Sequence, residues 1–322
     1  MELGTIYESI REDLDKVEEK LRLLCKSDFP QLAEILDYSL RSNGKRIRPA
    51  LTLLSGSFYG YNLDYLMSMA AAIELMHTAT LVHDDAIDNS LIRRGRATVN
   101  KLWGEDKAVL LGDYLFAEAG ILTASTKNLR VIKLFASTLK TISAGELNQA
   151  FCAFDLKQGR QHYFSRIAMK TASLFSMATE SGAALSQAPE ESIQVLIEYG
   201  HNIGIAFQIV DDVLDFVGTE DELGKPIGSD LTQGTLTLPG MLLMEHYPKD
   251  NPIKKGFQNR DRQANIEQAI EMIRNSPSII RECYQIAEDY CARACYNLKL
   301  LPENTAQRSL IRLADRIIQR RR

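Results

Sequence analysis

Apolar residues recur at intervals of three and four positions along most of the chain, which is the spacing that lines one face of an α-helix. No segment keeps the strict alternation that is typical of a half-buried strand. Glycine, proline and asparagine separate the apolar segments, and these residues favour turns. The pattern predicts helices over residues 5–24, 31–40, 63–83, 107–125, 130–155, 166–185, 191–217, 261–274, 279–299 and 305–320.

No linker of low complexity divides the 322 residues. The long apolar helices in the middle of the chain can bury their apolar faces against one another and still leave room for a binding cavity. The sequence therefore predicts an all-α fold, with residues 1–322 forming a single-domain helical bundle around a deep central cavity.

The composition is that of a soluble globular protein, with 45% hydrophobic residues, 25% charged residues and a net charge of −4. Nothing in it suggests nucleic-acid binding. The longest apolar run contains Glu74 and His77, and the N-terminus is charged, so neither a transmembrane segment nor a signal peptide is expected. Five cysteines without a C-x-x-C pair fit a reducing compartment, and we expect a cytoplasmic location.

Two acidic clusters share the spacing D-D-x-x-D, each near the end of an apolar helical run. There the helix dipole disfavours negative charge by about 0.3–1 kcal/mol per residue. One solvated acidic helix end is common, but two with the same spacing favour metal binding. Carboxylate oxygens suit Mg²⁺, which in proteins takes one or two carboxylates together with substrate phosphates. The clusters consist of Asp84, Asp85, Asp88, Asp211, Asp212 and Asp215.

Three basic stretches supply cations for such a phosphorylated ligand: "NGKRIRPAL" (43–51), "RRG" (93–95) and "GKPIGSDLTQGTLTLP" (224–239). Alone, the first is more typical of a solvated loop that begins at the glycine and stops at Pro49. The third has the composition of a mobile loop that closes over a site. Arginine binds phosphate oxygens bidentately and lysine binds them as a point charge. Together with the acidic clusters, these stretches indicate substrates that carry two diphosphates.

The motifs GKRIRP, HDDAID…RRG, KTASL, FQIVDDVLD and GKPIGSDL occur in this order between Gly44 and Pro239. In order and spacing the chain resembles the trans-isoprenyl diphosphate synthases. The resemblance implies the isoprenoid synthase fold, a homodimer, and a prenyltransferase that joins isopentenyl diphosphate head-to-tail to an allylic prenyl diphosphate. It also implies about three Mg²⁺ ions in each active site, held together with substrate phosphates.

The resemblance also implies roles for individual residues. Asp84 and Asp88 look like ligands of two Mg²⁺ ions and Asp211 like the main ligand of a third, with supporting roles for the remaining aspartates Asp85, Asp212 and Asp215. The residues that look like contacts to the allylic diphosphate are Arg93, Lys170 and Lys225. Those that look like the isopentenyl diphosphate pocket are Lys45, Arg48, His77 and Arg94. Thr171 and Gln208 look like neutral oxygen donors beside the allyl cation. Many members carry a lysine after the glycine at 234, where this chain has Thr235.

Product length is suggested by the residues before the first aspartate. Short-chain relatives often have an aromatic ring four or five positions before it, whereas this chain has Thr80 and Ala79, with the flexible Met76 one turn deeper. One helical turn rises about 5.4 Å, close to one isoprene unit, so a tail that runs along this helix is not stopped early. "HTATLVHDD" therefore resembles long-chain members, with all-trans products of roughly C30 to C50, near C40.

Other functions stay open. A short-chain farnesyl or geranylgeranyl diphosphate synthase shares all the motifs. A class I terpene cyclase also uses D-D-x-x-D but needs no second diphosphate pocket. The regulatory subunit of a heteromeric synthase can lose aspartates that this chain keeps. A di-iron carboxylate protein is suggested by Glu74-x-x-His77 and Glu198-x-x-His201 together with Glu118 and Glu146. The basic end "RIIQRRR" is more typical of a solvated terminus than of a substrate contact or a transient membrane-surface contact during product release.

Overall fold

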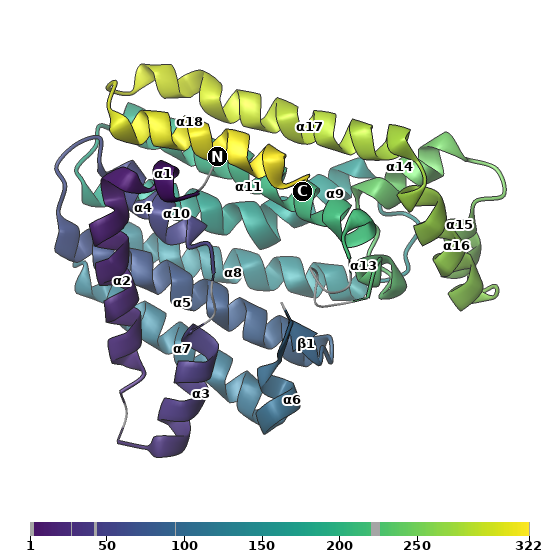
Figure 1. Ribbon diagram of the computed structural model, residues 1–322, viewed down its shortest axis with the longest axis horizontal. Coiled ribbons are helices and arrows are strands. Elements are labelled where there is room, and N and C mark those ends of the chain that lie inside the picture. The colour runs from purple at the N-terminus through teal and green to yellow at the C-terminus, as the bar shows by residue number, and fades with distance from the viewer. Residues whose placement is uncertain (1–2, 27, 42–43, 94, 220–225, 322) are drawn as a thin grey trace.

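The computed structural model describes residues 3–26, 28–41, 44–93, 95–219 and 226–321. Figure 1 shows its elements, in which η denotes a 3-10 or π-helical turn. In chain order they are α1 (Leu3–Ile6), η1 (Glu8–Ile10), α2 (Arg11–Leu24), α3 (Pro30–Leu40), α4 (Ile47–Gly56), α5 (Leu63–Ile87), β1 (Ile92–Arg93), β2 (Arg96–Ala97), α6 (Val99–Trp103), α7 (Glu105–Ser125), α8 (Leu129–Phe151), α9 (Arg160–Ile167), η2 (Ala168–Ala172), α10 (Ser173–Leu185), α11 (Glu190–Val217), α13 (Ser229–Thr232), α14 (Leu238–His246), α15 (Pro252–Phe257), α16 (Arg262–Arg274), α17 (Pro277–Tyr296), η3 (Asn297–Leu300), α18 (Thr305–Ile318) and η4 (Gln319–Arg321).

The fold is almost entirely helical, as the apolar spacing predicts. Over the described residues the strands are β1 and β2, two residues each, which form an antiparallel hairpin that pairs Ile92 with Ala97 and Arg93 with Arg96. This hairpin follows directly on the first acidic cluster. It therefore gives Arg93 a fixed backbone position beside that cluster.

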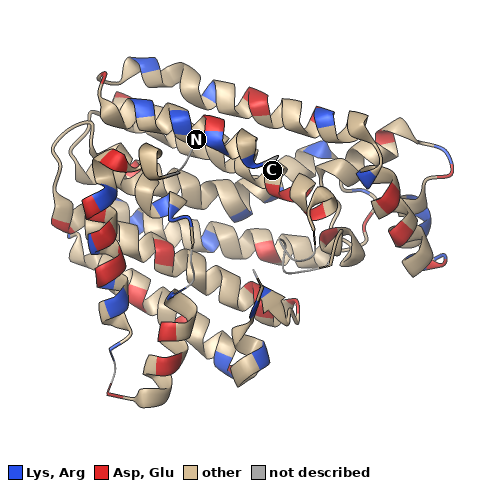
Figure 2. Cartoon of the chain, in the orientation of Figure 1, with Lys and Arg blue, Asp and Glu red and all other residues tan. Residues whose placement is uncertain are grey.

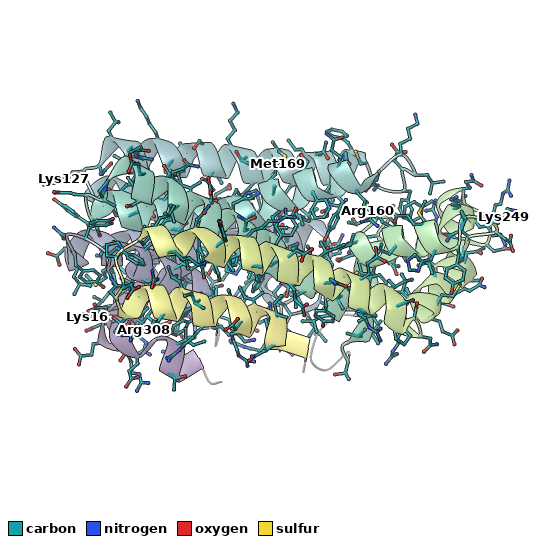
Figure 3. The ribbon with its side chains drawn as sticks, turned by 90° about the horizontal axis from the view of Figure 1, so that it is seen from above. Lys16, Lys127, Arg160, Met169, Lys249 and Arg308 are labelled. Atoms are coloured by element: carbon teal, nitrogen blue, oxygen red, sulfur yellow. The ribbon has the colours of Figure 1, made fainter. Side chains whose placement is uncertain are left out.

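Two long helices form the centre of the bundle. α5 packs against α4 and α7, and α11 packs against α10 and α17. α5 is buried along most of its length from Leu66 to Val82, and α11 along most of its length from Ser192 to Phe216. α17 and α18 run side by side across one face, which Figure 3 shows from above. Both central helices carry an acidic cluster in their last turns, so the packing of the core fixes where the clusters lie.

Several helix boundaries differ from the sequence-based prediction. α5 continues to Ile87, so Asp84 and Asp85 lie in its last turn and Asp88 is its C-cap. The segment 166–185 is not one regular helix, because the π-helical turn η2 separates α9 from α10. Pro49 does not end a turn. It lies in the first turn of α4, where a missing backbone N–H costs no hydrogen bond, and Arg48 lies in the same helix.

Two described helices are long and apolar enough to cross a membrane by length and composition alone: Leu63–Ile87 (α5) and Glu105–Ser125 (α7). The apolar window of α5 is 72% buried within the protein, as for a core helix. The corresponding window of α7 is 39% buried, because one side of this helix remains on the surface.

Candidate active site

The first acidic cluster is crowded with negative charge. Burial and the nearby carboxylate of Glu146 raise the pKa of Asp84 to about 7. Burial also raises the pKa of Asp85, although Arg93 Nε donates a hydrogen bond to Asp85 Oδ1 at 2.7 Å. Asp88 is exposed, and its pKa is raised by desolvation and by Asp230. The cluster therefore holds more negative charge than its protein neighbours balance.

The second cluster, on α11, is mostly bonded to protein groups. Asp212 Oδ1 accepts from Gln208 Nε2 and Asp212 Oδ2 from the Tyr163 hydroxyl, each at 2.7 Å. Asp215 accepts from Ser229 Oγ at 3.2 Å and from the backbone N–H of Asp230 at 3.4 Å. Both acids are buried, whereas the side chain of Asp211 is 35% exposed. Asp211 is thus the acid of this cluster that faces the outside of the helix core.

Both acidic clusters interact electrostatically with the same carboxylate, that of Asp230. The carboxylate of Asp230 contributes to the raised pKa of Asp88 in the first cluster and of Asp212 in the second. Burial is the larger cause at Asp212, whose pKa rises to about 7. Figure 2 shows acidic residues of α5 and α11 at the end of the bundle where β1 and α13 lie. The clusters therefore form one negatively charged site.

Lys170 is a second cation near the first cluster, in addition to Arg93, which pairs with Asp85. Lys170 Nζ is 2.7 Å from Glu146 Oε2 and donates a hydrogen bond to Gln149 Oε1 at 2.9 Å, and its charge lowers the pKa of both Asp84 and Asp88. The lysine lies in η2, and π-helical turns of this kind are frequent at functional sites.

Two glycines allow neighbouring helices to approach η2. A Cβ at Gly145 of α8 would lie 3.0 Å from Met169 Cβ, and a Cβ at Gly204 of α11 would lie 2.5 Å from Ala172 Cα. A larger residue at Gly204 would push the two backbones apart. The close approach brings Glu146, which follows Gly145, to Lys170.

A chain of hydrogen bonds orients the neutral oxygen donors that the sequence predicts. The Thr171 hydroxyl donates to Gln208 Oε1 at 2.6 Å, and Gln208 Nε2 donates to Asp212 at 2.7 Å. The buried Tyr163 hydroxyl completes the chain on the far side of Asp212. Burial and the carboxylate of Asp212 raise the pKa of Tyr163 well above its usual value, so this hydroxyl stays protonated. The side-chain amide of Gln208 is therefore fixed in one orientation.

The basic stretch before α4 is anchored by Arg46. Arg46 Nη1 donates to Glu74 Oε1 of α5 at 2.5 Å, and the same guanidinium pairs with Glu18 of α2. The backbone of Arg46 is left-handed, with φ of 47°, which turns its side chain away from those of its neighbours. This anchor fixes the start of α4 against α5, on which His77 follows Glu74 by one turn, and Arg48 lies in the first turn of α4. Lys45 is exposed, and the Tyr7 hydroxyl donates to its carbonyl oxygen at 3.3 Å.

The neighbouring rings of Phe175 and Phe207 form an aromatic platform beside Asp211. The Arg48 guanidinium is 4.7 Å from the centre of the Phe175 ring and 5.8 Å from that of Phe207. The Arg320 guanidinium is 4.5 Å from the Phe207 ring, and Arg320 Nη1 is 2.8 Å from Asp211 Oδ1. Two cations that lie far apart in the sequence therefore meet at one ring.

The donor set suits a hard cation that is shared with phosphate. Over the described residues, no three side chains of His, Cys, Asp or Glu come close enough to form a complete metal site. Asp84, Asp88 and Asp211 can thus supply only part of a coordination sphere. Magnesium sites that add substrate phosphates and water to one or two carboxylates have this form.

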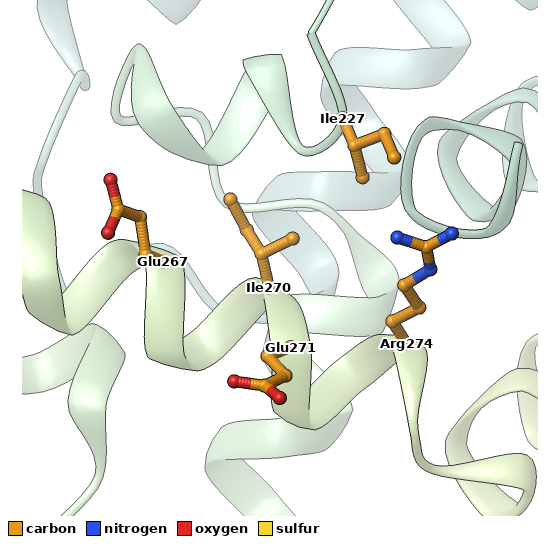
Figure 4. A pocket seen from close by; sticks show the side chains of 5 residues that line it. All are labelled: Ile227, Glu267, Ile270, Glu271 and Arg274. Carbon is orange, nitrogen blue, oxygen red and sulfur yellow. The ribbon is translucent and has the colours of Figure 1, made fainter. Parts of the chain in front are cut away.

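Two of the predicted binding residues, Arg94 and Lys225, lie outside the described residues. Beyond Lys225 the chain is held by α16, where Ile270 packs against Gly228, and Gly228 N–H donates to the Asp215 carbonyl at 2.9 Å. Figure 4 shows the groove beside this contact. It is lined by Ile227, Glu267, Ile270, Glu271 and Arg274. Thr235 is buried, and its N–H donates to the carbonyl oxygen of Asp230 at 2.8 Å.

The predicted chain-length residues lie on α5 behind the first cluster. Ala79 and Met76 are fully buried, and Thr80 is half-buried with its hydroxyl donating to the His77 carbonyl at 2.7 Å. Deeper along the helix, the Thr123 hydroxyl of α7 lies 3.9 Å from Met69 Sδ. These residues face the interior rather than solvent.

The proposed di-iron ligands lie in separate networks. Glu74 pairs with Arg46, Glu146 pairs with Lys170, and Glu198 accepts a hydrogen bond from Asn297 at 2.9 Å. Cations and amides occupy carboxylate oxygens that a di-iron centre would need. The structure therefore does not assemble this ligand set.

Four residues that contribute to the site were not assigned a role from the sequence: Arg46, Tyr163, Asp230 and Arg320. Glu146, which the sequence offered as a di-iron ligand, instead pairs with Lys170 beside the first cluster. Asp230 lies inside a quoted motif and Arg46 inside another, so their positions carried a signal. Tyr163 lies in a segment with no motif, and Arg320 lies in the basic end "RIIQRRR", which is more typical of a solvated terminus; only the folded chain brings them to the aspartates.

Comparisons with known proteins agree with this fold. A family model described as polyprenyl synthetase matches residues 29–273. The heptaprenyl diphosphate synthase component 2 of Geobacillus stearothermophilus is 37% identical over 315 residues, which cover 97% of each chain. The crystal structure of a polyprenyl synthase from Caulobacter crescentus CB15, complexed with calcium and isoprenyl diphosphate, has a TM-score of 0.94 at 31% identity and covers 100% of this chain and 98% of that chain. A decaprenyl diphosphate synthase from Rhodobacter capsulatus has a TM-score of 0.91 at 35% identity and covers 100% of both chains.

The bundle is therefore that of the all-α isoprenoid synthases, as the motifs predicted. The chain belongs to the polyprenyl synthetase family, whose members are prenyltransferases.

Proposed function

We propose that the chain catalyses the Mg²⁺-dependent, head-to-tail condensation of isopentenyl diphosphate with an allylic prenyl diphosphate, giving a long all-trans polyprenyl diphosphate. The observation that carries this proposal is the single negatively charged site formed by two acidic clusters, with Lys170 beside one and Arg48 and Arg320 beside the other. A diphosphate with divalent cations balances both signs of charge at once.

The protein residues fall into three groups in this reaction. Asp84, Asp88 and Asp211 would hold the metal ions, because over the described residues their carboxylates accept no hydrogen bond from the protein and only Asp211 has an ion pair, with Arg320. Asp85, Asp212 and Asp215 already accept hydrogen bonds, which suits them to orient the ligands and the loop at 228–230. Bound Mg²⁺ stabilises the negative charge that develops on the departing diphosphate.

Cations of the chain complete the diphosphate sites. Lys170 and Arg93 would contact the allylic diphosphate, as Lys225 would by its motif. Lys45, Arg48 and His77, together with Arg94 by its motif, would hold isopentenyl diphosphate. Bidentate guanidinium contacts fix the orientation of a diphosphate as well as its charge.

The reaction itself requires no protein nucleophile. The allylic carbon–oxygen bond breaks, leaving a cation and a diphosphate, and the alkene of isopentenyl diphosphate attacks the cation. A proton is then lost to the departing diphosphate. Thr171 and Gln208 are oriented by hydrogen bonds so that their oxygens can stabilise the cation, and the apolar walls of α5 exclude water.

A long product is supported by two independent features. Thr80 and Ala79 place no ring below Asp84, so the tail is not stopped after the first turns. The relatives described above are named for heptaprenyl and decaprenyl products. We propose products of roughly C30 to C50, since each turn of α5 accommodates about one isoprene unit. The short-chain synthase is the alternative.

We further propose one domain spanning residues 1–322, a cytoplasmic location and a homodimer. The dimer is supported by an exposed apolar face on two packed helices: Leu110 and Ile121 of α7, and Leu147 and Phe151 of α8. Monomers rarely leave so many large apolar residues on neighbouring helices uncovered. A second type of subunit is the alternative, because the Geobacillus relative is named as one component of its synthase.

Product analysis tests the proposal. The purified chain is incubated with Mg²⁺, labelled isopentenyl diphosphate and geranyl, farnesyl or geranylgeranyl diphosphate, and the products are separated by length. We expect polyprenyl diphosphates of roughly C30 to C50, and no product after chelation of the metal. Products that stop at about C15 to C20 would establish the short-chain alternative.

Two further controls separate the remaining functions. A terpene cyclase would release a hydrocarbon from the prenyl diphosphate without isopentenyl diphosphate. A chain that is inactive alone but active when a second component is added would establish the heteromeric organisation.

A further inference from the structure

Arg320, in the turn η4, is held against α11 by two contacts. Its Nη1 lies 2.8 Å from Asp211 Oδ1, and its guanidinium lies 4.5 Å from the centre of the Phe207 ring. Phe207 and Asp211 are four residues apart and share one face of the helix. The Arg320 side chain is only 19% exposed. The sequence favours a solvated C-terminus, but the Arg320 guanidinium contacts the Asp211 carboxylate and the Phe207 ring.

A second guanidinium contacts the same aromatic platform. Arg48 lies over Phe175 and within 5.8 Å of the centre of the Phe207 ring, and the two rings are 5.2 Å apart. The guanidinium groups of Arg48 and Arg320 repel each other at this platform. An anion that contacts both groups therefore binds more favourably than an anion that contacts only one of them. Diphosphate is such an anion, since guanidinium groups bind its oxygens bidentately.

We propose that Arg320 pairs with Asp211 in the metal-free enzyme and so occupies the place of a divalent ion. When a divalent ion binds Asp211, the Arg320 side chain moves to the diphosphate beside Arg48. The inference rests on the metal-binding role proposed above for Asp211. A divalent ion and a guanidinium compete for the same carboxylate oxygen because both are positive. Displacement from Asp211 therefore releases a phosphate-binding group at the place where the second substrate is proposed to bind.

This exchange predicts opposite effects on the two ligands. Removal of the guanidinium removes a competitor of the metal, so the metal alone binds more tightly. The same change removes a contact to the diphosphate, so isopentenyl diphosphate binds more weakly. A purely structural role of Arg320 would weaken both ligands, because a disturbed site binds everything less well.

The test compares Arg320→Gln with Arg312→Gln, which alters an exposed arginine of α18. Mn²⁺ binding without phosphate is followed by electron paramagnetic resonance of the free ion, and binding of isopentenyl diphosphate at saturating Mg²⁺ by calorimetry. In Arg320→Gln we expect Mn²⁺ affinity to rise roughly two- to fivefold, the range of a partly exposed ion pair, and isopentenyl diphosphate affinity to fall by a similar factor or more. Arg312→Gln should match the parent in both measurements.

Arg320→Lys refines the result. Lysine retains the charge near Asp211 but lacks the bidentate fork, so Mn²⁺ affinity should return toward that of the parent while isopentenyl diphosphate stays weaker. Unchanged or weaker Mn²⁺ binding in Arg320→Gln overturns the inference, as does unchanged binding of isopentenyl diphosphate.

Asp211→Asn separates this inference from the proposed function. If Asp211→Asn weakens Mn²⁺ binding and Arg320→Gln changes nothing, only the role of Arg320 fails. If Asp211→Asn also leaves Mn²⁺ binding unchanged, the metal-binding role of Asp211 fails and the inference with it.

Discussion

The aspartates of the first cluster occupy positions that are unfavourable for carboxylates. The C-terminal end of α5 disfavours negative charge by about 0.3–1 kcal/mol per residue, and Asp84 and Asp88 repel each other by a further ~0.2–0.5 kcal/mol as an i, i+4 pair. Burial and Glu146 raise the pKa of Asp84 to about 7. A site with this balance is stabilised when cations enter it.

Asp84→Asn should therefore separate stability from ligand binding. The amide keeps the shape of the side chain and removes its charge, so the metal-free variant should unfold about 1–3 °C above the parent. Mg²⁺ with inorganic pyrophosphate should raise the melting temperature of the parent but hardly that of the variant, and prenyl transfer should fall by at least about a hundredfold. Differential scanning calorimetry and the product assay measure these effects.

Asp289→Asn is the matched control, because Asp289 is an exposed acid of α17. This variant should retain both the ligand-induced shift and the activity. A variant Asp84→Asn that keeps the stabilisation by Mg²⁺ and pyrophosphate would contradict a metal-binding role of Asp84.

In the basic stretch before α4, residue type alone does not predict which cation is available to bind phosphate. Its sequence contains Lys45, Arg46 and Arg48, and all three suit phosphate equally well. Arg46 instead joins α2 to α5 through Glu18 and Glu74, because its left-handed backbone directs the guanidinium to these acids. A backbone conformation of this kind is set by tertiary contacts, so the division of roles among the three cations could not be predicted from the sequence.

At the scale of helices, the apolar spacing predicted nearly all long elements and failed at short ones. α5, α7, α11 and α18 begin and end within a few residues of the prediction. The short helices α4, α6 and α14 were missed because each is shorter than about three turns, too short to show a helical period. The π-helical turn was also missed, since its residues continue the apolar spacing of an ordinary helix; in the structure α8 and α11 approach it closely at Gly145 and Gly204.

The side chains of α5 that precede Asp84 should determine the length of the product. Ala79 is buried about one turn behind Asp84, so a phenylalanine ring at this position should block a tail that runs along the helix. We expect Ala79→Phe to shorten the products from roughly C30–C50 to about C15–C20 while the consumption of the primer continues. Separation of the labelled products by length measures the effect.

The control for Ala79→Phe must exclude damage to the core, since overpacking alone costs about 1–3 kcal/mol. Thr80→Phe provides it, because Thr80 is half-buried and accommodates a ring with less strain. Both variants should shorten the products and remain folded by circular dichroism. An active, folded variant with the parental product length would show that the tail follows another path.

The tertiary fold brings into contact residues that lie far apart in the sequence. Arg320 lies beside Asp211 although they are more than 100 residues apart, and Tyr163 of α9 donates to Asp212 of α11 although α10 lies between them in the sequence. The repeated spacing indicated the aspartates, and the resemblance to the trans-isoprenyl diphosphate synthases implied Lys170, Thr171 and Gln208, which the structure places near them. Residues that reach the site through tertiary packing have no such spacing, and the structure is needed to find them.

The proposed homodimer is the property of the whole molecule that is most directly testable. Leu110 of α7 and Leu147 of α8 are 65% and 59% exposed, and they lie at the same end of this antiparallel helix pair. Replacing both by glutamate should place two charges per subunit in the proposed interface, where an unpaired buried charge costs several kcal/mol. We expect the parent to be a dimer and Leu110→Glu/Leu147→Glu to be a monomer at micromolar concentration, as measured by size-exclusion chromatography with light scattering. Leu300→Glu changes an exposed leucine of η3 and should remain dimeric. A monomeric parent, or a dimeric double variant, would place the subunit contact elsewhere and leave the apolar face of α7 and α8 available to a different subunit.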